Sequence, residues 1–296
     1  MSVITVCEYL WNILTSYTVV KFMLNSFDLP NKKGLRILVL GDVVGKPGRQ
    51  ALEQHLRPLR QRLEVDVVVA NGENAAGGAG IDAGTAHDIH KAGVDLITLG
   101  DHAFQRKGVL EFLDNNSAWC IRPYNLPAQS TPGKGWCTWT RADGLQLHVS
   151  NLMGRVFMGG SIDCPFKGID AMLAELPKIE NRLVLCDFHA EATSEKWAMG
   201  RYCDGRISLL VGTHTHVQTS DAQILPGGTG FITDLGMTGS NTGVIGMDAG
   251  VAIRRFTSPT PAPYQIAEGE GILHGIVADL DTNTGKTLWI NAIREG

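Results

Sequence analysis

Residues 35–42 read LRILVLGD, an apolar run that is followed at once by glycine and aspartate. Such a run, rich in branched side chains, predicts a buried strand. Pro47 then stands where the first turn of a helix tolerates proline, and a helix is predicted as far as about Leu63. A strand that ends in Gly41 and Asp42 and continues into a helix is the unit from which parallel sheets are built.

The same unit recurs along the chain. Strands are predicted over residues 65–70 and 95–99, and Asp82 is a plausible N-cap for the helix between them. Two further buried strands are predicted over residues 182–186 and 207–211. We therefore predict an α/β fold with parallel strands and crossover helices.

The remaining segments are less regular. Residues 136–140 and 145–150 predict a β-hairpin, and residues 271–278 and 286–293 predict a second hairpin that closes the fold. Residues 151–180 are rich in glycine and methionine and fit an inserted or lid segment.

The first 34 residues differ from the rest. Residues 9–20 are uncharged, but polar side chains interrupt them, and they fall short of the roughly 18 apolar residues that a membrane span needs. No basic region precedes them, which argues against a signal peptide. We interpret residues 1–34 as a dispensable or mis-started extension, with a membrane or partner contact as the alternative, and residues 35–296 as one domain.

Composition excludes several classes of protein. The chain of 296 residues is 44% hydrophobic and 19% charged, which excludes wholesale disorder, and its formal net charge is −4. This mild acidity argues against a stable complex with nucleic acid. The six cysteines form no Cys-x-x-Cys pair, so we expect reduced thiols and a cytoplasmic protein without a membrane span. A homo-oligomer is left open.

A short polar cluster follows each of the five predicted strands. In open α/β sheets, ligands bind outside the carboxyl ends of the strands, so these clusters should meet at one edge. The carboxylates, carboxamide and imidazoles concerned are Asp42, Glu73, Asn74, Asp101, His102, His189, His214 and His216. Converging carboxylates repel one another, and a bound cation is the usual remedy. We therefore predict a metal site.

The donor types restrict the choice of metal. Carboxylate, carboxamide and imidazole without thiolate suit manganese, iron or zinc, and they argue against copper or an iron–sulfur cluster. His214 and His216 are two residues apart and do not match the helical His-Glu-x-x-His motif. Six or seven donor groups exceed one tetrahedral site, whereas two ions about 3.5–4 Å apart use that number and suit in-line attack at phosphorus.

Rival motifs do not match. Gly41, Gly45 and Gly48 lack the spacing of a dinucleotide-binding loop, and Pro47 occupies the place of the serine or threonine of a P-loop. The Gly-x-Ser-x-Gly elbow of serine hydrolases is absent from the sequence. The sequence therefore argues against a dinucleotide-binding fold, a P-loop fold and a serine-hydrolase fold.

Four longer strings carry a resemblance to a known family. They are GDVVGKPGR at 41–49, NGENAA at 71–76, DFHAEATSEK at 187–196 and GTHTHVQT at 212–219. Together with the Gly-Asp-His sequence at 100–102, they resemble the calcineurin-like metallophosphoesterases and, more narrowly, their YmdB-type bacterial branch. The resemblance implies a four-layer α/β/β/α sandwich, a dinuclear metal centre and hydrolysis of cyclic nucleotides in the cytoplasm.

The resemblance also implies roles for single residues. One ion would be held by Asp42, Asn74 and His216, the other by Asp101, His189 and His214, and Glu73 would bridge the two. His102 would be the phosphate-facing acid or hydrogen-bond donor. Arg49 could touch the substrate phosphate or be a structural arginine. For three further residues of these strings, a position at a helix start is as good an explanation as a role in the site. They are Glu191, Glu195 and Lys196.

One position departs from the branch. Asp101 stands where most of its members have asparagine, and aspartate is an equally good oxygen ligand that adds a negative charge. That charge should tighten the binding of divalent ions. For the two ions we expect iron or manganese ahead of zinc or magnesium.

These observations predict a metal-dependent phosphoric diester hydrolase. The expected substrate is a small phosphodiester, with a 2′,3′-cyclic nucleotide ahead of a 3′,5′-cyclic one. The alternative is a non-catalytic regulator that contains metal and binds a nucleotide or a protein partner. Intact ligands at every position weigh against this alternative.

Overall fold

The computed structural model describes residues 29–127, 131–179 and 181–296. The chain separates into two units, Met1–Lys32 and Lys33–Gly296, and the fold described below is that of the second unit. The predicted extension over residues 1–34 lies almost entirely outside the described residues, and its role stays a prediction. No helix in the described ranges is long and apolar enough to cross a membrane.

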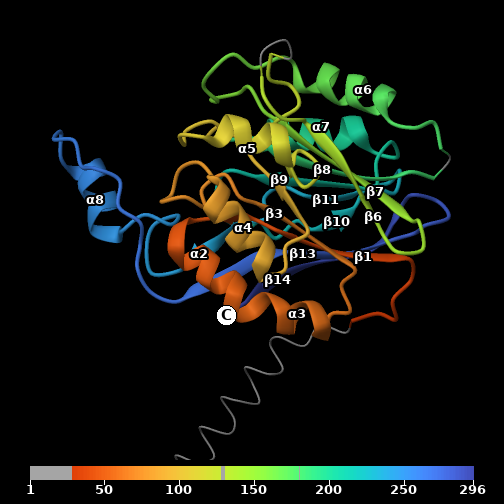
Figure 1. Cartoon of the computed structure of the whole chain (residues 1–296), viewed down its shortest axis with the longest axis horizontal. Coiled ribbons are helices and arrows are strands. Elements are labelled where there is room, and N and C mark those ends of the chain that lie inside the picture. Colours follow the sequence, from red (N-terminus) through yellow and green to blue (C-terminus); the bar gives the residue numbers. More distant parts are fainter. Residues whose placement is uncertain (1–28, 128–130, 180) are drawn as a thin grey trace, which may run out of the picture. The chain divides into compact units, whose positions relative to one another are not determined.

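The first sheet has eight strands (Figure 1). They are β1 (Leu35–Leu40), β2 (Asp42–Val43), β3 (Val67–Asn71), β4 (Leu96–Thr98), β5 (Cys120–Ile121), β12 (Met237–Ser240), β13 (Gly271–Leu280) and β14 (Thr287–Glu295). The order is β2-β12-β13-β1-β3-β4-β5, and β14 pairs with β13. The predicted C-terminal hairpin is confirmed, but β13 runs antiparallel to β1, so the sheet is mixed and not wholly parallel.

The second sheet has six strands in the order β10-β11-β9-β8-β7-β6. They are β6 (Trp136–Thr140), β7 (Gln146–Met153), β8 (Leu183–His189), β9 (Leu209–Thr213), β10 (Gln223–Ile224) and β11 (Gly230–Ile232). The hairpin of β6 and β7 is confirmed. Because β8 and β9 belong to this sheet, the predicted site residues follow strands of two sheets. The expectation of a single sheet edge, drawn from the strand pattern, was wrong.

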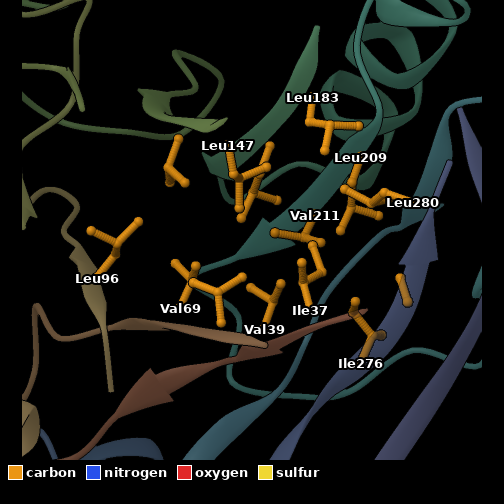
Figure 2. Close-up of a cluster of buried hydrophobic side chains, with 14 of the residues drawn as sticks. Ile37, Val39, Val69, Leu96, Leu147, Leu183, Leu209, Val211, Ile276 and Leu280 are labelled. Carbon is orange, nitrogen blue, oxygen red and sulfur yellow. The ribbon is translucent and has the colours of Figure 1, made fainter. Parts of the chain in front are cut away.

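The two sheets pack face to face through a shared apolar core (Figure 2). Along β8, Leu183 and Leu185 belong to this core, whereas Val184 and Phe188 belong to a second core on the opposite face of the strand. Successive residues of a strand point to opposite faces, so a strand buried on both faces reads as a continuous apolar run. That is why residues 182–186 predicted a buried strand.

Two helices complete the second core, namely α6 (Pro165–Glu175) and α7 (Thr193–Cys203). They contribute Ile169, Met172 and Met199, which are fully buried against the second sheet. The segment expected as an insertion or lid, residues 151–180, thus contains a helix that is part of the core. A lid role for the residues between β7 and α6 stays a prediction.

Other helices accompany the first sheet (Figure 1). The helix predicted from Pro47 is observed as α2 (Gly45–Ala51), a π-helical turn (Leu52–Leu56) and α3 (Arg57–Arg62), and α2 contacts β12 and β13. The others are α4 (Ala83–Ala92) and α5 (Val109–Asn116), whereas α8 (Ala249–Thr257) lies away from both sheets, at the left of Figure 1. The mixed α/β fold with two sheets and helices is confirmed.

Asp82 is the N-cap of α4, as predicted. Asp82 Oδ1 accepts a hydrogen bond from the Thr85 backbone N–H at 2.9 Å, and Thr85 Oγ1 accepts one from the Asp82 N–H at 3.0 Å. This reciprocal pair satisfies two donors that a helix start otherwise leaves free.

Candidate metal centre

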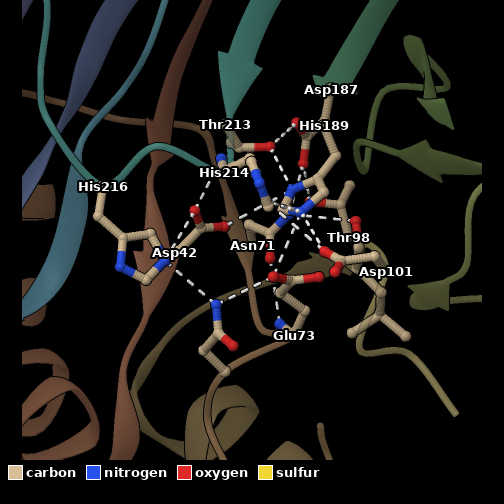
Figure 3. Close-up of polar contacts among 12 residues, drawn as sticks. Asp42, Asn71, Glu73, Thr98, Asp101, Asp187, His189, Thr213, His214 and His216 are labelled. Atoms are coloured by element: carbon tan, nitrogen blue, oxygen red, sulfur yellow. Dashed lines mark hydrogen bonds and ion pairs between the residues drawn. The ribbon is translucent and has the colours of Figure 1, made fainter. Parts of the chain in front are cut away.

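The predicted polar clusters meet where strands of both sheets end (Figure 3). The first sheet supplies Asp42 in β2, Glu73 and Asn74 after β3, and Asp101 and His102 after β4; the second supplies His189 at the end of β8, and His214 and His216 after β9. Every one of these side chains contacts at least one other member of the set. The two sheets therefore assemble one site from all eight residues.

A first group of donors faces a common point. Glu73, Asp101, His189 and His214 each offer a ligand atom, and these atoms all lie within 4.8 Å of one another. His189 Nε2 lies 3.2 Å from Glu73 Oε1, 3.1 Å from Asp101 Oδ1 and 3.0 Å from His214 Nδ1. Two carboxylates and two imidazole nitrogens at such distances match the donor set of a metal ion.

A second group adjoins Glu73. His216 Nε2 lies 3.4 Å from Asp42 Oδ2 and 3.2 Å from Asn74 Nδ2. The same Asn74 nitrogen donates to Glu73 Oε1 at 3.0 Å, so this carboxylate oxygen contacts both groups, as a bridging ligand would.

Asn74 presents its amide nitrogen to the site, whereas a metal would need its oxygen. Its Oδ1 lies 2.9 Å from His102 Nδ1. Rotation of the amide by half a turn would direct the oxygen at the site and leave Nδ2 as a donor to His102. The amide can therefore serve as a ligand without moving its backbone.

The three imidazoles of the two groups are each held by an acceptor outside them. His189 Nδ1 lies 2.9 Å from Thr213 Oγ1, His214 Nε2 lies 3.1 Å from Glu191 Oε2, and His216 Nδ1 lies 2.8 Å from the Ile245 carbonyl oxygen. A neutral imidazole that donates from one nitrogen carries its lone pair on the other. In all three rings that other nitrogen faces the site, which is the arrangement of metal-binding histidines.

The support under His189 sets its tautomer. Thr213 Oγ1 donates its only proton to Asp187 Oδ1 at 2.7 Å, so it can only accept from His189 Nδ1–H. Asp187 is buried and also accepts from Asn71 Nδ2 and Thr98 Oγ1. This network fixes Nδ1 as a donor and leaves Nε2 facing the carboxylates of the first group, where a proton or a metal ion can occupy it.

Buried negative charge dominates the electrostatics of the site. Burial raises the pKa of Asp42 well above its usual value. Burial also acts to raise the pKa of Glu73, but the charge of His189 and hydrogen bonds from His102 and His189 outweigh it, and the pKa is lowered. The hydrogen bond with Glu73 raises the pKa of His102.

Among the described residues of the site, one buried carboxylate oxygen forms no hydrogen bond, although His189 Nδ1 lies 4.0 Å from it. Asp42 Oδ1 is buried and accepts no hydrogen bond from any residue that the structure describes. A buried polar atom in this condition costs free energy. A cation would satisfy it, so the residues present fit a metal ion.

Gly100 allows the ligands to approach one another. A Cβ atom at this position would lie 2.1 Å from Glu73 Oε2 and 2.4 Å from His189 Nε2. Any side chain here would displace both groups.

Arg49 is not part of this cluster. Its guanidinium donates to the Ala75 carbonyl oxygen and lies 3.6 Å from Asp88 Oδ2 on α4. These contacts brace the segment that follows β3. A contact with substrate stays a prediction.

Two of the residues that orient the imidazoles, Thr213 and Asp187, were missed in the sequence, and Glu191 was named there only as a residue that a helix start explains equally well. All three lie within the strings at 187–196 and 212–219, close to predicted ligands, and that adjacency was the available signal. Ile245 contributes only a backbone carbonyl, which no residue type reveals.

Paired sheets that carry this donor set at their strand ends are of the metallophosphoesterase type. A family model described as "YmdB-like protein" matches residues 38–293, and the chain belongs to this family. The resemblance predicted from the four strings is confirmed.

Individual relatives match over nearly the whole described chain. The 2′,3′-cyclic-nucleotide 2′-phosphodiesterase of Bacillus subtilis is 44% identical over 259 residues, which cover 88% of this chain and 96% of the relative. A structure described as a hypothetical protein from Thermus thermophilus has a TM-score of 0.81 and 40% identity, covering 88% of this chain and all of that chain (100%). A novel phosphatase from Mycoplasma pneumoniae has a TM-score of 0.82 and 31% identity, covering 89% and 94% of the two chains.

Proposed function

We propose that the protein is a metal-dependent phosphodiesterase that hydrolyses small cyclic phosphodiesters, with 2′,3′-cyclic nucleotides ahead of 3′,5′-cyclic ones. The observation that carries this proposal is the convergence of three oriented imidazoles with the carboxylates of Asp42, Glu73 and Asp101. The 44% identity to a Bacillus subtilis enzyme named for 2′,3′-cyclic nucleotides supports the substrate class.

Two metal positions account for the donors. We assign Asp101, His189 and His214 to one ion, Asp42, Asn74 and His216 to the other, and Glu73 to both. Oxygen and imidazole donors without thiolate suit iron or manganese ahead of zinc or magnesium. When bound, such ions stabilise the charge on the phosphoryl oxygens and activate a water for in-line attack.

The acid of the reaction comes from the chain itself. His102 is 30% exposed and lies at the edge of the site, with Nδ1 3.5 Å from Glu73 Oε1 and Nε2 3.5 Å from Asp101 Oδ2. A partly exposed imidazole beside the ligands can reach a substrate that the ligands themselves face. We assign His102 to the donation of a proton or hydrogen bond to the leaving ribose oxygen.

Location and partners follow from the same proposal. The five cysteines that the structure describes are free, and free thiols are typical of the reducing cytoplasm, where we place the protein. Its partner is the small phosphodiester itself. The absence of a stable nucleic-acid complex and the oligomeric state stay predictions.

Turnover measured together with metal content tests the proposed function. We expect purified protein to hydrolyse 2′,3′-cyclic AMP faster than 3′,5′-cyclic AMP, to lose activity after chelation and to regain it with Mn²⁺ or Fe²⁺. A protein that holds both metals and turns over neither these nucleotides nor a model diester would instead be a non-catalytic regulator.

Two variants of Asp101 separate the contribution of coordination to metal binding from the contribution of charge. Asp101→Asn keeps an oxygen ligand of the same size, so we expect it to fold and to bind metal somewhat more weakly. Asp101→Ala removes the ligand and should weaken metal binding by at least about 10-fold, since even partners outside the coordination sphere contribute that much. Metal titration of both variants checks this. Equal behaviour of the two would show that charge is what matters, and unchanged binding in both would exclude Asp101 as a ligand.

A further inference from the structure

A buried ion pair lies beside the candidate metal centre. Lys196, in the first turn of α7, has no exposed side-chain surface, and its Nζ lies 2.7 Å from Oδ2 of Asp234, which is 1% exposed. Desolvation offsets most of the attraction within such a pair, so burial of both charges adds little to stability. The pair therefore requires an explanation other than the stability of the fold.

Asp234 holds the turn that carries two of the imidazoles. Its Oδ2 also accepts from the backbone N–H of Thr215 at 3.1 Å and from Thr215 Oγ1 at 2.7 Å. Thr215 stands between His214 and His216, whose φ angles are +99° and +64°. Non-glycine residues adopt such left-handed values at a cost in free energy, and they persist only where surrounding contacts hold them.

The second oxygen of Asp234 reaches the backbone of another ligand. Asp234 Oδ1 accepts from the Gly236 N–H at 2.8 Å, and the Gly236 carbonyl accepts from the Asp42 N–H at 3.3 Å. Asp42 Oδ2 in turn accepts from the His214 N–H at 2.9 Å. A single carboxylate is thus connected to the backbone around three proposed ligands.

We propose that Lys196 and Asp234 are positioning residues for the metal centre. Asp234 keeps the turn from His214 to His216, and the backbone of Asp42, in the conformation that aims their side chains at the metals. Lys196 compensates the charge of Asp234, which would otherwise add to the carboxylates already buried there. This inference rests on the proposed metal centre, but it concerns residues that contact neither metal nor substrate.

The test compares two double variants that each remove a buried ion pair. Lys196→Met/Asp234→Asn removes both charges at similar size. The matched control, Arg36→Met/Asp279→Asn, removes the pair in which Arg36 Nε lies 2.6 Å from Asp279 Oδ1, at the end of β1 away from Asp42. Chelated protein is titrated with Mn²⁺ by calorimetry, and circular dichroism reports the fold. We expect the first variant to bind Mn²⁺ about 10–100-fold more weakly and the control to bind it with wild-type affinity, even where its Tm falls.

If the first double variant does not fold, single variants of Thr215 test whether Asp234 positions the turn from His214 to His216. Thr215→Val removes only the hydroxyl that donates a hydrogen bond to Asp234 Oδ2. We expect it to bind Mn²⁺ roughly 5-fold more weakly, which corresponds to the free energy of one hydrogen bond. Thr215→Ser keeps the hydroxyl and should bind like wild type. Wild-type affinity in Thr215→Val, or in a folded Lys196→Met/Asp234→Asn variant, overturns the positioning role alone. Wild-type protein that binds no Mn²⁺ overturns the metal centre as well.

Discussion

Replacement of Glu73 by glutamine is expected to lower kcat/KM for a 2′,3′-cyclic nucleotide by at least about 10²-fold, the scale on which loss of a principal electrostatic element acts. Glu73 is 1% exposed, and its Oε1 contacts His189 in one donor group and Asn74 in the other. Glutamine keeps the shape and one acceptor oxygen, but it removes the negative charge that both proposed ions share. Turnover and metal content measured on one preparation check this expectation.

A suitable control for this variant is Glu175→Gln. Glu175 is an exposed acid on α6 that accepts hydrogen bonds from Tyr124 and Trp136 and contacts none of the proposed ligands. Its replacement should leave turnover unchanged. Near-normal turnover of Glu73→Gln with full metal occupancy would contradict the bridging role and the dinuclear assignment.

His102→Ala should lower kcat by about 10²–10⁴-fold, the usual contribution of a positioned general acid. All proposed ligands remain in place in this variant, so both metals should stay bound. Steady-state kinetics gives the loss in rate, and elemental analysis of the same sample gives the metal content.

The exposed His87 on α4 provides the comparison for His102. Its ring packs against Phe112 and Trp119, which are not among the proposed site residues, and His87→Ala should not alter turnover. Loss of an ion from His102→Ala would make His102 a ligand, and the proposed role as acid would then be wrong.

The elements of the fold could be predicted wherever the signal was local. The run at residues 182–186 predicted β8 because both faces of that strand are buried, and Asp82 predicted the start of α4 because a cap bonds an N–H three residues ahead. The partner of each strand could not be predicted in this way. Leu35 of β1 pairs with Leu280 of β13, and no pattern near either residue specifies the other.

The same division holds for the site. The convergence of the proposed ligands could be predicted because carboxylates and imidazoles directly follow apolar strands, and strand ends are where α/β folds bind small molecules and ions. The pairing of each imidazole with its acceptor, such as His189 with Thr213, could not be predicted, because it depends on segments brought together by packing. Lys196 illustrates this, since its place at a helix start indicates an exposed residue, whereas its partner Asp234 lies 38 residues further on.

The sequence by itself therefore determined the α/β class and the family, and it named the residues proposed as metal ligands, because each depends on residue types and spacings within short segments. Only the tertiary structure decided that the donors come from two sheets, which imidazole nitrogen faces the site, and that a buried ion pair stands beside the turn at His214–His216. The reason is physical. Periodicity and capping act over a few residues, whereas the tautomer of a histidine and the pairing of a buried charge are set by whichever distant groups the folded chain places within hydrogen-bond distance.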